Sequence, residues 1–308
     1  MRQVAVLVLA AAMIPSAWSR LTPGDTAPVP FASGERLVYH VEWTPPLWLF
    51  FLPAMEAGQA TLNLAGETQY KDKKALKIIF TARSSGMLAK FIGKSIEDSY
   101  EFTTDPETFC TYRVFESERE GKRMRDIEVV YLPETRQVHI KEVDVSGLVP
   151  RVLRDKDYDE IPPNVKDLFS ALYALRQTDL AVNSSRQVLV AFNERVKEVE
   201  IRVEKSEQVH TPAGNYRAWQ LDTIAVFGGL FKNGGQFRIW LSADKRKMPV
   251  KFEAKISLGK VTGSLIEARF MENGATNRPL AGPNFESATS GKAGGFLPDP
   301  PNAVSVSR

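Results

Sequence analysis

The chain has 308 residues, of which 43% are hydrophobic and 25% are charged, and its formal net charge is +3. This composition is typical of a globular protein and excludes a wholly disordered chain or a bundle of membrane-spanning helices. Lysine and arginine alternate with acidic residues along the chain, so the sequence lacks the clustered basic face that a nucleic-acid partner requires.

The first predicted segment is a secretory signal peptide at residues 1–19. Arg2 supplies the positive start, Val4 to Ile14 form an uncharged apolar run, and Ala17-Trp18-Ser19 offers small residues for cleavage before Arg20. The run is shorter than the about 20 residues that a membrane span needs. No cysteine stands at the junction to carry a lipid anchor. We therefore expect a periplasmic or secreted protein.

Residues 31–271 are predicted to form a single β-rich domain after a short lead at 20–30. Apolar and polar residues alternate with a period of two, most clearly at 248–258, where every even position is apolar. Pro212 and Gly214 mark a tight turn, and 233–235 (Asn-Gly-Gly) marks a hairpin. No strand–helix–strand rhythm occurs. The predicted fold is mainly β, as a large antiparallel curved sheet or an open barrel or sandwich.

One short helix is expected at about 165–176. Asn164 resembles an N-cap with an acid three residues later, and Leu168, Phe169, Leu172 and Leu175 follow at helical spacing. This helix divides the strands into two sets, 31–155 and 186–270.

Two segments are predicted to lie outside the strands and the helix. The acidic run from Asp155 to Glu160 is interpreted as a solvated loop, because it lacks the glycine and terminal glutamate of a calcium-binding loop. Residues 272–308 are rich in Gly, Pro, Ser and Asn and lack periodicity, which predicts a disordered tail.

The sequence contains no motif for catalysis or for a cofactor. The nucleophile elbow, the zinc-binding helix, the P-loop and the dinucleotide fingerprint are all missing. His40, His139 and His210 lack partners at metal-ligand spacing and are interpreted as surface or turn residues. Cys110, the only cysteine, is interpreted as a small apolar residue. We predict no catalytic residue, no metal and no cofactor, although carboxylates from distant strands leave a hydrolase open.

Two apolar connections are the candidate site. The first is bracketed by Pro45 and Pro53, which keep it out of a sheet ladder, and the second spans 84–93. Successive connections of a meander alternate ends, so we expect both at the same end of the sheet. The candidate ligand or membrane contacts are Trp48, Leu49, Phe50, Phe51, Met87, Leu88, Phe91 and Ile92. These residues form either a mouth that meets an apolar ligand or lipid surface, or a plug that closes the core.

Several segments resemble, in order, an exported bacterial family known as domain of unknown function 3108. They are Phe31-x-x-Gly34-Glu35-x-Leu37-x-Tyr39, Glu56-Ala57-Gly58-x-Ala60-x-Leu62, Asp167-Leu168-x-Ser170-Ala171-Leu172-Tyr173-x-Leu175-Arg176, Thr211-Pro212-Ala213-Gly214, and Ile239-Trp240-Leu241-Ser242-Ala243-Asp244 with Pro249-Val250. The resemblance spans roughly residues 31–270 and implies a periplasmic β-rich protein with no assigned activity. The apolar segment Pro45 to Pro53 is longer than the connection expected there.

These observations predict an exported, non-catalytic protein of the cell envelope that binds a hydrophobic or lipidic molecule or a membrane surface. A curled antiparallel sheet can enclose an apolar concavity that holds such a ligand. The alternatives are a structural or protein-interaction module with an envelope protein as its partner, and a hydrolase with dispersed residues.

Overall fold

The computed structural model describes residues 31, 33–49, 51–85, 95–224, 236–256 and 259–270. Within this part of the chain the strands form one antiparallel sheet of 14 strands. The strands are β1 (Glu35–Thr44), β2 (Met55–Tyr70), β3 (Lys73–Ser84), β4 (Glu97–Thr104), β5 (Thr111–Glu120), β6 (Arg123–Leu132), β7 (Gln137–Asp144), β8 (Arg151–Tyr158), β9 (Ser185–Phe192), β10 (Arg195–Thr211), β11 (Gly214–Ile224), β12 (Gln236–Ser242), β13 (Pro249–Ile256) and β14 (Gly259–Arg269). The helices are η1 (Leu47–Leu49) and α2 (Leu168–Arg176). The predicted mainly β fold with a large antiparallel curved sheet is confirmed.

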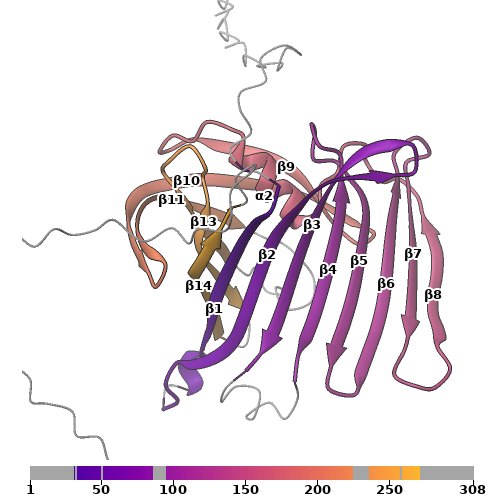
Figure 1. The fold of residues 1–308 in the computed structure, drawn as a ribbon, viewed down its shortest axis with the longest axis horizontal. Helices are drawn as coiled ribbons and strands as arrows, with labels where there is room; N and C mark the ends of the chain where they lie inside the picture. The colour runs from indigo at the N-terminus through magenta and orange to yellow at the C-terminus, as the bar shows by residue number, and fades with distance from the viewer. Residues whose placement is uncertain are drawn as a thin grey trace, which may run out of the picture.

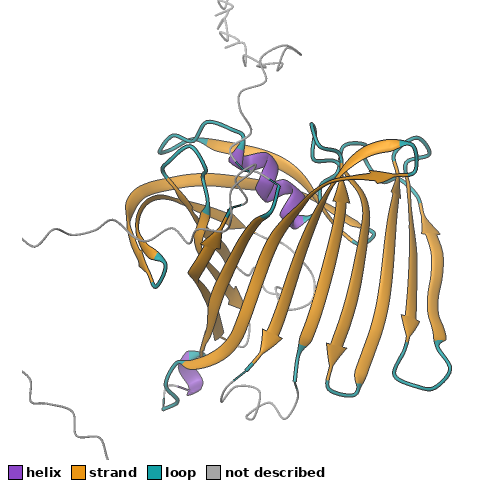
Figure 2. Ribbon diagram, in the orientation of Figure 1, coloured by secondary structure: helices purple, strands orange, loops and turns teal. Residues whose placement is uncertain are grey.

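The strand order is β8-β7-β6-β5-β4-β3-β2-β1-β14-β13-β12-β11-β10-β9, so the sheet consists of two meanders. They join where β1 pairs with β14, from Arg36 opposite Arg269 to Thr44 opposite Lys260. Figure 1 shows these two strands side by side, although they come from opposite ends of the described chain. The sheet curls, and α2 and β9 lie near one end of its strands (Figures 1 and 2).

Alternation along each strand divides the sheet into an inner face, which carries the core, and an outer face. Leu37 pairs with Leu62 across β1 and β2, and both side chains are buried on the inner face. Helix α2 packs on the same face, since the ring of Phe169 stacks on Phe80 with centroids 4.6 Å apart. The helix thus supplies a second layer over the inner face of β3 and β4.

Helix α2 begins later than the sequence predicted. Asp167, and not Asn164, is its N-cap, and its Oδ1 accepts hydrogen bonds from the N–H groups of Phe169 and Ser170 at 2.8 and 2.9 Å. Asn164 has a left-handed backbone with φ of 63°, and Lys166 still pairs with β9. Residues 165 and 166 bond to strands, so the helix can begin only after them.

A buried ion pair connects α2 to β1. Both side chains of Glu35 and Arg176 are fully buried, with Nη1 to Oε1 at 2.6 Å and Nη2 to Oε2 at 2.7 Å. Tyr173 donates to Glu35 Oε1 at 3.0 Å, and the guanidinium lies 4.9 Å from the ring centre of Phe31. These residues belong to two of the segments that carry the family resemblance. Those segments therefore build a structural junction.

Gly58, in another of these segments, is required by the backbone geometry. Its φ is 148°, and a Cβ atom built there would lie 1.9 Å from the carbonyl oxygen of Arg83. The register of β1 against β2 shifts beside it, between Val41 and Glu42. A side chain at this bulge would clash with β3, so only glycine fits.

The two edge strands, β8 and β9, do not pair with each other. Instead, the β9–β10 turn reaches the opposite half of the sheet. The Tyr131 hydroxyl donates to the carbonyl oxygen of Asn193 at 3.1 Å, and Arg154 Nη1 lies 3.4 Å from Glu194 Oε2. Side chains therefore bring the two ends of the curled sheet together without a backbone ladder.

The prediction of a solvated loop at the acidic run Asp155 to Glu160 was wrong for most of the run. Asp155 and Asp157 belong to edge strand β8, opposite Lys141 and His139 of β7. Lys156 pairs with buried Ile140, so cations face inward and acids face outward. The apolar–polar alternation that marks a strand is absent from this run, because an edge strand can carry polar residues on both faces.

Several predictions concern residues outside the described part of the chain. These are the signal peptide at 1–19, the lead at 20–30, the hairpin at 233–235 and the tail at 272–308. Among the described helices, none combines the length and the apolar character that crossing a membrane requires.

Candidate functional site

The first predicted apolar connection is exposed at one end of the sheet. Trp48 and Leu49 belong to η1, and Phe51 follows in a turn. The exposed fractions are 92% for Leu47, 66% for Trp48 and 67% for Phe51, whereas Leu49 is partly buried. The described side chains of this connection are therefore turned mainly to solvent.

The second predicted connection begins beside the first. Ser85 N–H donates to the Ala57 carbonyl at 3.0 Å, and Ser85 Oγ donates to Glu56 Oε1 at 2.7 Å. Both connections therefore leave the sheet at the same end, next to the start of β2. The remaining predicted contacts, Phe50, Met87, Leu88, Phe91 and Ile92, lie outside the described residues.

Sequence reasoning missed a third apolar connection, between β7 and β8. Leu148 is fully exposed, and Val149 has an exposed fraction of 81%. Strands β1 and β7 point the same way in the meander, so both connections lie at the same end of the sheet, as Figure 1 shows. The signal was present, since Gly147 and Pro150 bracket two apolar residues in a turn. We call Leu47, Trp48, Phe51, Leu148 and Val149 the apolar rim.

The inner face of the N-terminal half changes from apolar to charged towards the rim. Buried Val114 is followed on the same face of β5 by Glu116, Glu118 and Glu120, because side chains two residues apart share a face. The charged patch comprises Asp98 of β4, these three glutamates, Arg123 and Arg125 of β6, Glu142 of β7 and Arg154 of β8.

Ion pairs bind most of the charged patch together. Arg125 Nη1 pairs with Glu142 Oε1, and Arg154 Nη2 lies 3.4 Å from Glu142 Oε2. Arg123 Nη2 lies 2.8 Å from Glu118 Oε2. These partly buried pairs form a network across four strands that holds the carboxylates in place.

The acids of the patch also shift one another's protonation. Burial, followed by the negative charge of Glu118, raises the pKa of Glu116 to about 7. Burial likewise raises the pKa of Glu118, although the guanidinium of Arg123 opposes this shift. Burial and the charge of Glu116 raise the pKa of Tyr100, which therefore stays neutral. Glu116 is thus the carboxylate that changes charge near neutral pH.

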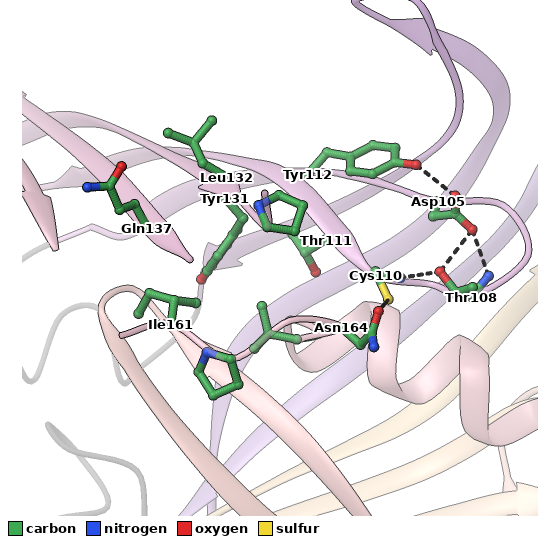
Figure 3. A pocket seen from close by; sticks show the side chains of 13 residues that line it. Asp105, Thr108, Cys110, Thr111, Tyr112, Tyr131, Leu132, Gln137, Ile161 and Asn164 are labelled. Atoms are coloured by element: carbon green, nitrogen blue, oxygen red, sulfur yellow. Dashed lines mark hydrogen bonds between the residues drawn. The ribbon is translucent and has the colours of Figure 1, made fainter. Parts of the chain in front are cut away.

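A cavity of about 190 Å³ lies at the opposite end of these strands and contains Cys110 (Figure 3). Its lining includes Asp105, Thr108, Tyr112 and Asn164. The Tyr112 hydroxyl donates to Asp105 Oδ2 at 2.7 Å, and Thr108 donates to Asp105 Oδ1 through its N–H and hydroxyl. Burial alone would raise the pKa of Asp105, but these hydrogen bonds lower it. The Asp105 carboxylate therefore already accepts hydrogen bonds from residues close to it in the chain.

Cys110 is not the buried apolar residue that was predicted. It is half-buried, with its Sγ 3.6 Å from Asn164 Oδ1 and 4.0 Å from Lys166 Nζ, and no histidine lines the cavity. The neighbouring Phe109 takes the core position instead, because its left-handed backbone with φ of 57° reverses the expected phase. The geometry lacks the histidine base of a thiol-based catalytic site.

A second hollow, of about 290 Å³, lies on the outer face over β2 and β3. Its lining is polar, with Thr61, Asn63 and Thr81 on the floor strands. Both arginines in the lining already have partners, since Arg36 pairs with a glutamate at 3.2 Å and Arg83 with another at 2.6 Å. The hollow therefore offers no uncompensated charge to a ligand.

The structure does not assemble a metal centre from the described residues. No group of three or more His, Cys, Asp or Glu there is arranged to hold a metal ion. His139 lies on the outer face with Nδ1 2.8 Å from Asp157 and Nε2 3.3 Å from Asp155. His40 and His210 are also at least partly exposed. The histidines thus have the surface positions that the sequence predicted.

Comparisons with known proteins give the fold and the family. A crystal structure of a β-barrel-like protein of domain of unknown function 1849 from Brucella abortus matches with a TM-score of 0.51 and 9% identity, over 79% of this chain and 99% of that one. A protein with a YmcC-like fold from Bacteroides fragilis matches with a TM-score of 0.31 and 10% identity, over 78% of this chain and 97% of that one. No curated protein matches the chain. At these identities the first similarity shows the fold alone. The family model "protein of unknown function (DUF3108)" matches residues 38–266, and the chain belongs to this family.

Proposed function

We propose that this protein is an exported, non-catalytic protein of the cell envelope that binds a lipid surface through the apolar rim. The observation that carries the proposal is the exposure of five apolar side chains, from two connections, at one end of the sheet. Three of them, Leu47, Trp48 and Phe51, stand close together on the β1–β2 connection. Soluble proteins seldom expose a group of large apolar side chains unless these meet a membrane, a partner or a ligand.

The local structure keeps the rim exposed. Pro45, Pro46 and Pro53 flank the β1–β2 connection and cannot donate to a sheet ladder, so the segment stays outside the strands. Its short helix η1 is fixed by the hydrogen bond from Leu49 N–H to the Pro46 carbonyl at 2.8 Å. Each large apolar side chain that moves fully from water into lipid contributes roughly 1.5–3 kcal/mol. Trp48 is also a residue type that favours the membrane–water interface.

Export is the part of the proposal that rests on the N-terminal segment. Arg2, the apolar run Val4 to Ile14 and the small residues before Arg20 have the order of a cleavable signal peptide. A protein delivered to the cell envelope by this route would meet membrane surfaces there.

Vesicle flotation tests the rim. The full chain is mixed with phosphatidylcholine vesicles, with and without phosphatidylglycerol, and the bound fraction is measured for the variants Trp48→Ser/Phe51→Ser and Leu148→Ser/Val149→Ser. We expect each pair to lower vesicle partitioning at least tenfold without changing the thermal midpoint, because the side chains are exposed.

Val182→Ser is the matched control, since Val182 is an exposed apolar residue outside the rim. It should partition like the unmodified protein. Unchanged partitioning of both rim variants would contradict the proposal. A large loss of stability would instead show that these side chains serve the core.

A further inference from the structure

Glu116 is the one carboxylate of the charged patch for which the described residues provide no partner. The residue is 8% exposed and, among the described residues, its side chain makes neither a hydrogen bond nor an ion pair. Its neighbours do have partners: Glu142 pairs with Arg125 and Arg154, and Asp98 accepts a hydrogen bond from the Arg119 N–H at 2.9 Å. A buried carboxylate without a partner is costly, so its retention calls for an explanation.

Two orphaned polar atoms lie on the same patch. In the described chain, the buried side-chain N and O atoms that lack a hydrogen bond are Glu118 Oε2 and Arg154 Nε. Glu118 Oε2 lies 2.8 Å from Arg123 Nη2, which gives an ion pair without hydrogen-bond geometry. Both unsatisfied atoms found in the described part of the chain thus lie on the same patch as Glu116. This is the pattern expected of a polar site built for a ligand.

The charge of the patch determines whether it favours a cationic or an anionic ligand. Among the described residues of the patch, five carboxylates face three guanidinium groups, so this set carries two more negative than positive charges when ionised. Glu194, at the β9–β10 turn, adds a further carboxylate beside Arg154. A cationic group is therefore favoured over an anionic one.

The surroundings of Glu116 suit an organic cation. Tyr100 lies directly opposite on β4 and Ile127 directly opposite on β6, so an aromatic ring and an aliphatic side chain flank the carboxylate. A cation beside a carboxylate and an aromatic ring gains from both contacts. An ammonium group fits both neighbours, because it donates hydrogen bonds to a carboxylate and is attracted to the face of an aromatic ring.

Access to the patch comes from the end of the sheet that carries the apolar rim. The exposed fraction of the side chains rises from 12% at Glu142 to 33% at Arg125 and 45% at Arg123. Arg123 stands at the β5–β6 turn, which leaves the sheet at the same end as the β1–β2 and β7–β8 connections. A molecule that enters there meets apolar side chains first and Glu116 deeper on the inner face.

We infer that the charged patch binds the primary ammonium group of an amphiphilic ligand, with Glu116 as its counter-ion and the apolar rim in contact with its hydrocarbon part. The inference rests on the proposed lipid-binding function and names the headgroup chemistry.

Octylamine, octanol and octanoate are suitable probes, because they share a chain and differ in the charge of the headgroup. Binding is measured by calorimetry at pH 8, where the amine is protonated, for the full chain, for Glu116→Gln and for Glu101→Gln. Glu101 is a matched control, since it lies on the outer face and pairs with Lys77 at 2.8 Å. We expect octylamine to bind at least tenfold more tightly than octanol, and Glu116→Gln alone to abolish that preference.

The preference should also weaken at pH 5.5, where Glu116 is protonated. The charged and titratable groups that face it are Asp98 and Tyr100 of β4, Glu118 of β5, Arg125 of β6, Glu142 of β7 and Arg154 of β8. Binding at pH 7 should release protons from the unmodified protein, measured in two buffers of different ionisation enthalpy. This second measurement remains decisive if Glu116→Gln does not fold.

The outcomes separate the two proposals. Equal binding of all three probes, unaffected by Glu116→Gln and without proton release, overturns the ammonium site while an apolar binding surface stands. Vesicle binding that the rim variants do not affect, together with an octylamine preference that Glu116→Gln abolishes, supports the ammonium site and contradicts the rim. Loss of the preference in Glu101→Gln as well would show a general charge effect and would overturn the assignment to Glu116.

Discussion

The buried pair between Glu35 and Arg176 allows the sharpest test of how the helix is held on the sheet. The substitution Glu35→Gln keeps the size of the side chain but leaves the guanidinium of Arg176 without its counter-ion in a fully buried site. The remaining contacts of Arg176 are the carbonyl oxygen of Arg246 at 3.1 and 3.2 Å and the rings of Phe31 and Tyr173. Burial alone would lower the pKa of Arg176, but Glu35 raises it.

The expected loss follows from the burial of both partners. Removing one partner of a buried ion pair costs about 3–5 kcal/mol of unfolding free energy, because an uncompensated charge stays in the core. For a protein of this size the corresponding fall of the thermal midpoint is about 6–20 °C. The double substitution Glu35→Gln/Arg176→Met removes the buried charge altogether. It should therefore be more stable than Glu35→Gln alone.

Urea unfolding followed by tryptophan fluorescence measures both values. Glu267→Gln is the control, because Glu267 forms a half-exposed pair with Arg36 at 3.2 Å, and such pairs contribute about 0–1 kcal/mol. A loss below about 1 kcal/mol for Glu35→Gln, which is the range of a surface pair, would refute the reasoning. The reasoning would also be refuted if the double variant lost as much unfolding free energy as the single variants Glu35→Gln and Arg176→Met lose together. The two charges would then not interact.

Two further predictions concern the inner face and a strand bulge. The folded pKa of Glu116 is about 7 and its ordinary value is 4.5, so the folded state binds the proton more tightly. The stability that this proton adds is present below about pH 4.5 and is lost as pH rises to 7. Glu116→Gln should therefore stabilise the protein at pH 8 by up to about 3 kcal/mol and have little effect at pH 4.5. A gain in urea-unfolding free energy that is the same at both pH values would disprove this. Gly58→Ala should destabilise by more than about 1 kcal/mol, because the new Cβ would lie 1.9 Å from a backbone oxygen. Gly147→Ala, where the nearest non-adjacent atom is 3.8 Å away, should be near neutral in the same thermal melt.

Periodicity was sufficient to predict the class of the fold because each strand buries one face. Val199, Ile201 and Val203 alternate with Glu200 and Arg202 in the sequence, and the structure buries all three apolar side chains. Trp240 is also buried, and its indole N–H donates to Glu207 Oε1 at 2.8 Å. Phe252 packs against the core, and the side chain of Ile256 lies outside the described residues.

Pairing between distant strands could not be predicted. Nothing in the alternation of β1 indicates that its neighbour is β14, because the period of a strand encodes which face is buried and not which partner lies beside it. The same limit applies to the charged patch. Glu116, Glu118 and Glu120 continue the buried phase of Val114, and this pattern can be read from the sequence. The opposing arginines come from other strands, β6 and β8, and their positions cannot be read from it.

The predictions for the start of α2 and for the environment of Cys110 were wrong for local reasons. Asn164 and Asp167 both have side chains that can cap a helix. Residues 165 and 166 form hydrogen bonds to strands, so the helix starts after them and Asp167 is the N-cap. Cys110 is half-buried while the adjacent Phe109 is buried, because Phe109 has a left-handed backbone. Backbone conformations of this kind are not encoded in hydrophobic patterns.

The pairing of β1 with β14 has a consequence for the order in which the protein folds. Either meander can form from neighbouring strands, which brings together residues that are close in sequence. The ladder between Arg36 and Arg269 must instead close a loop of almost the whole described chain. Loop-closure entropy makes such contacts slow to form, so we expect the seam between the halves to be the last ladder completed. Until then β1 and β14 are both open edges, and a chain caught at this stage could exchange its seam with a second copy.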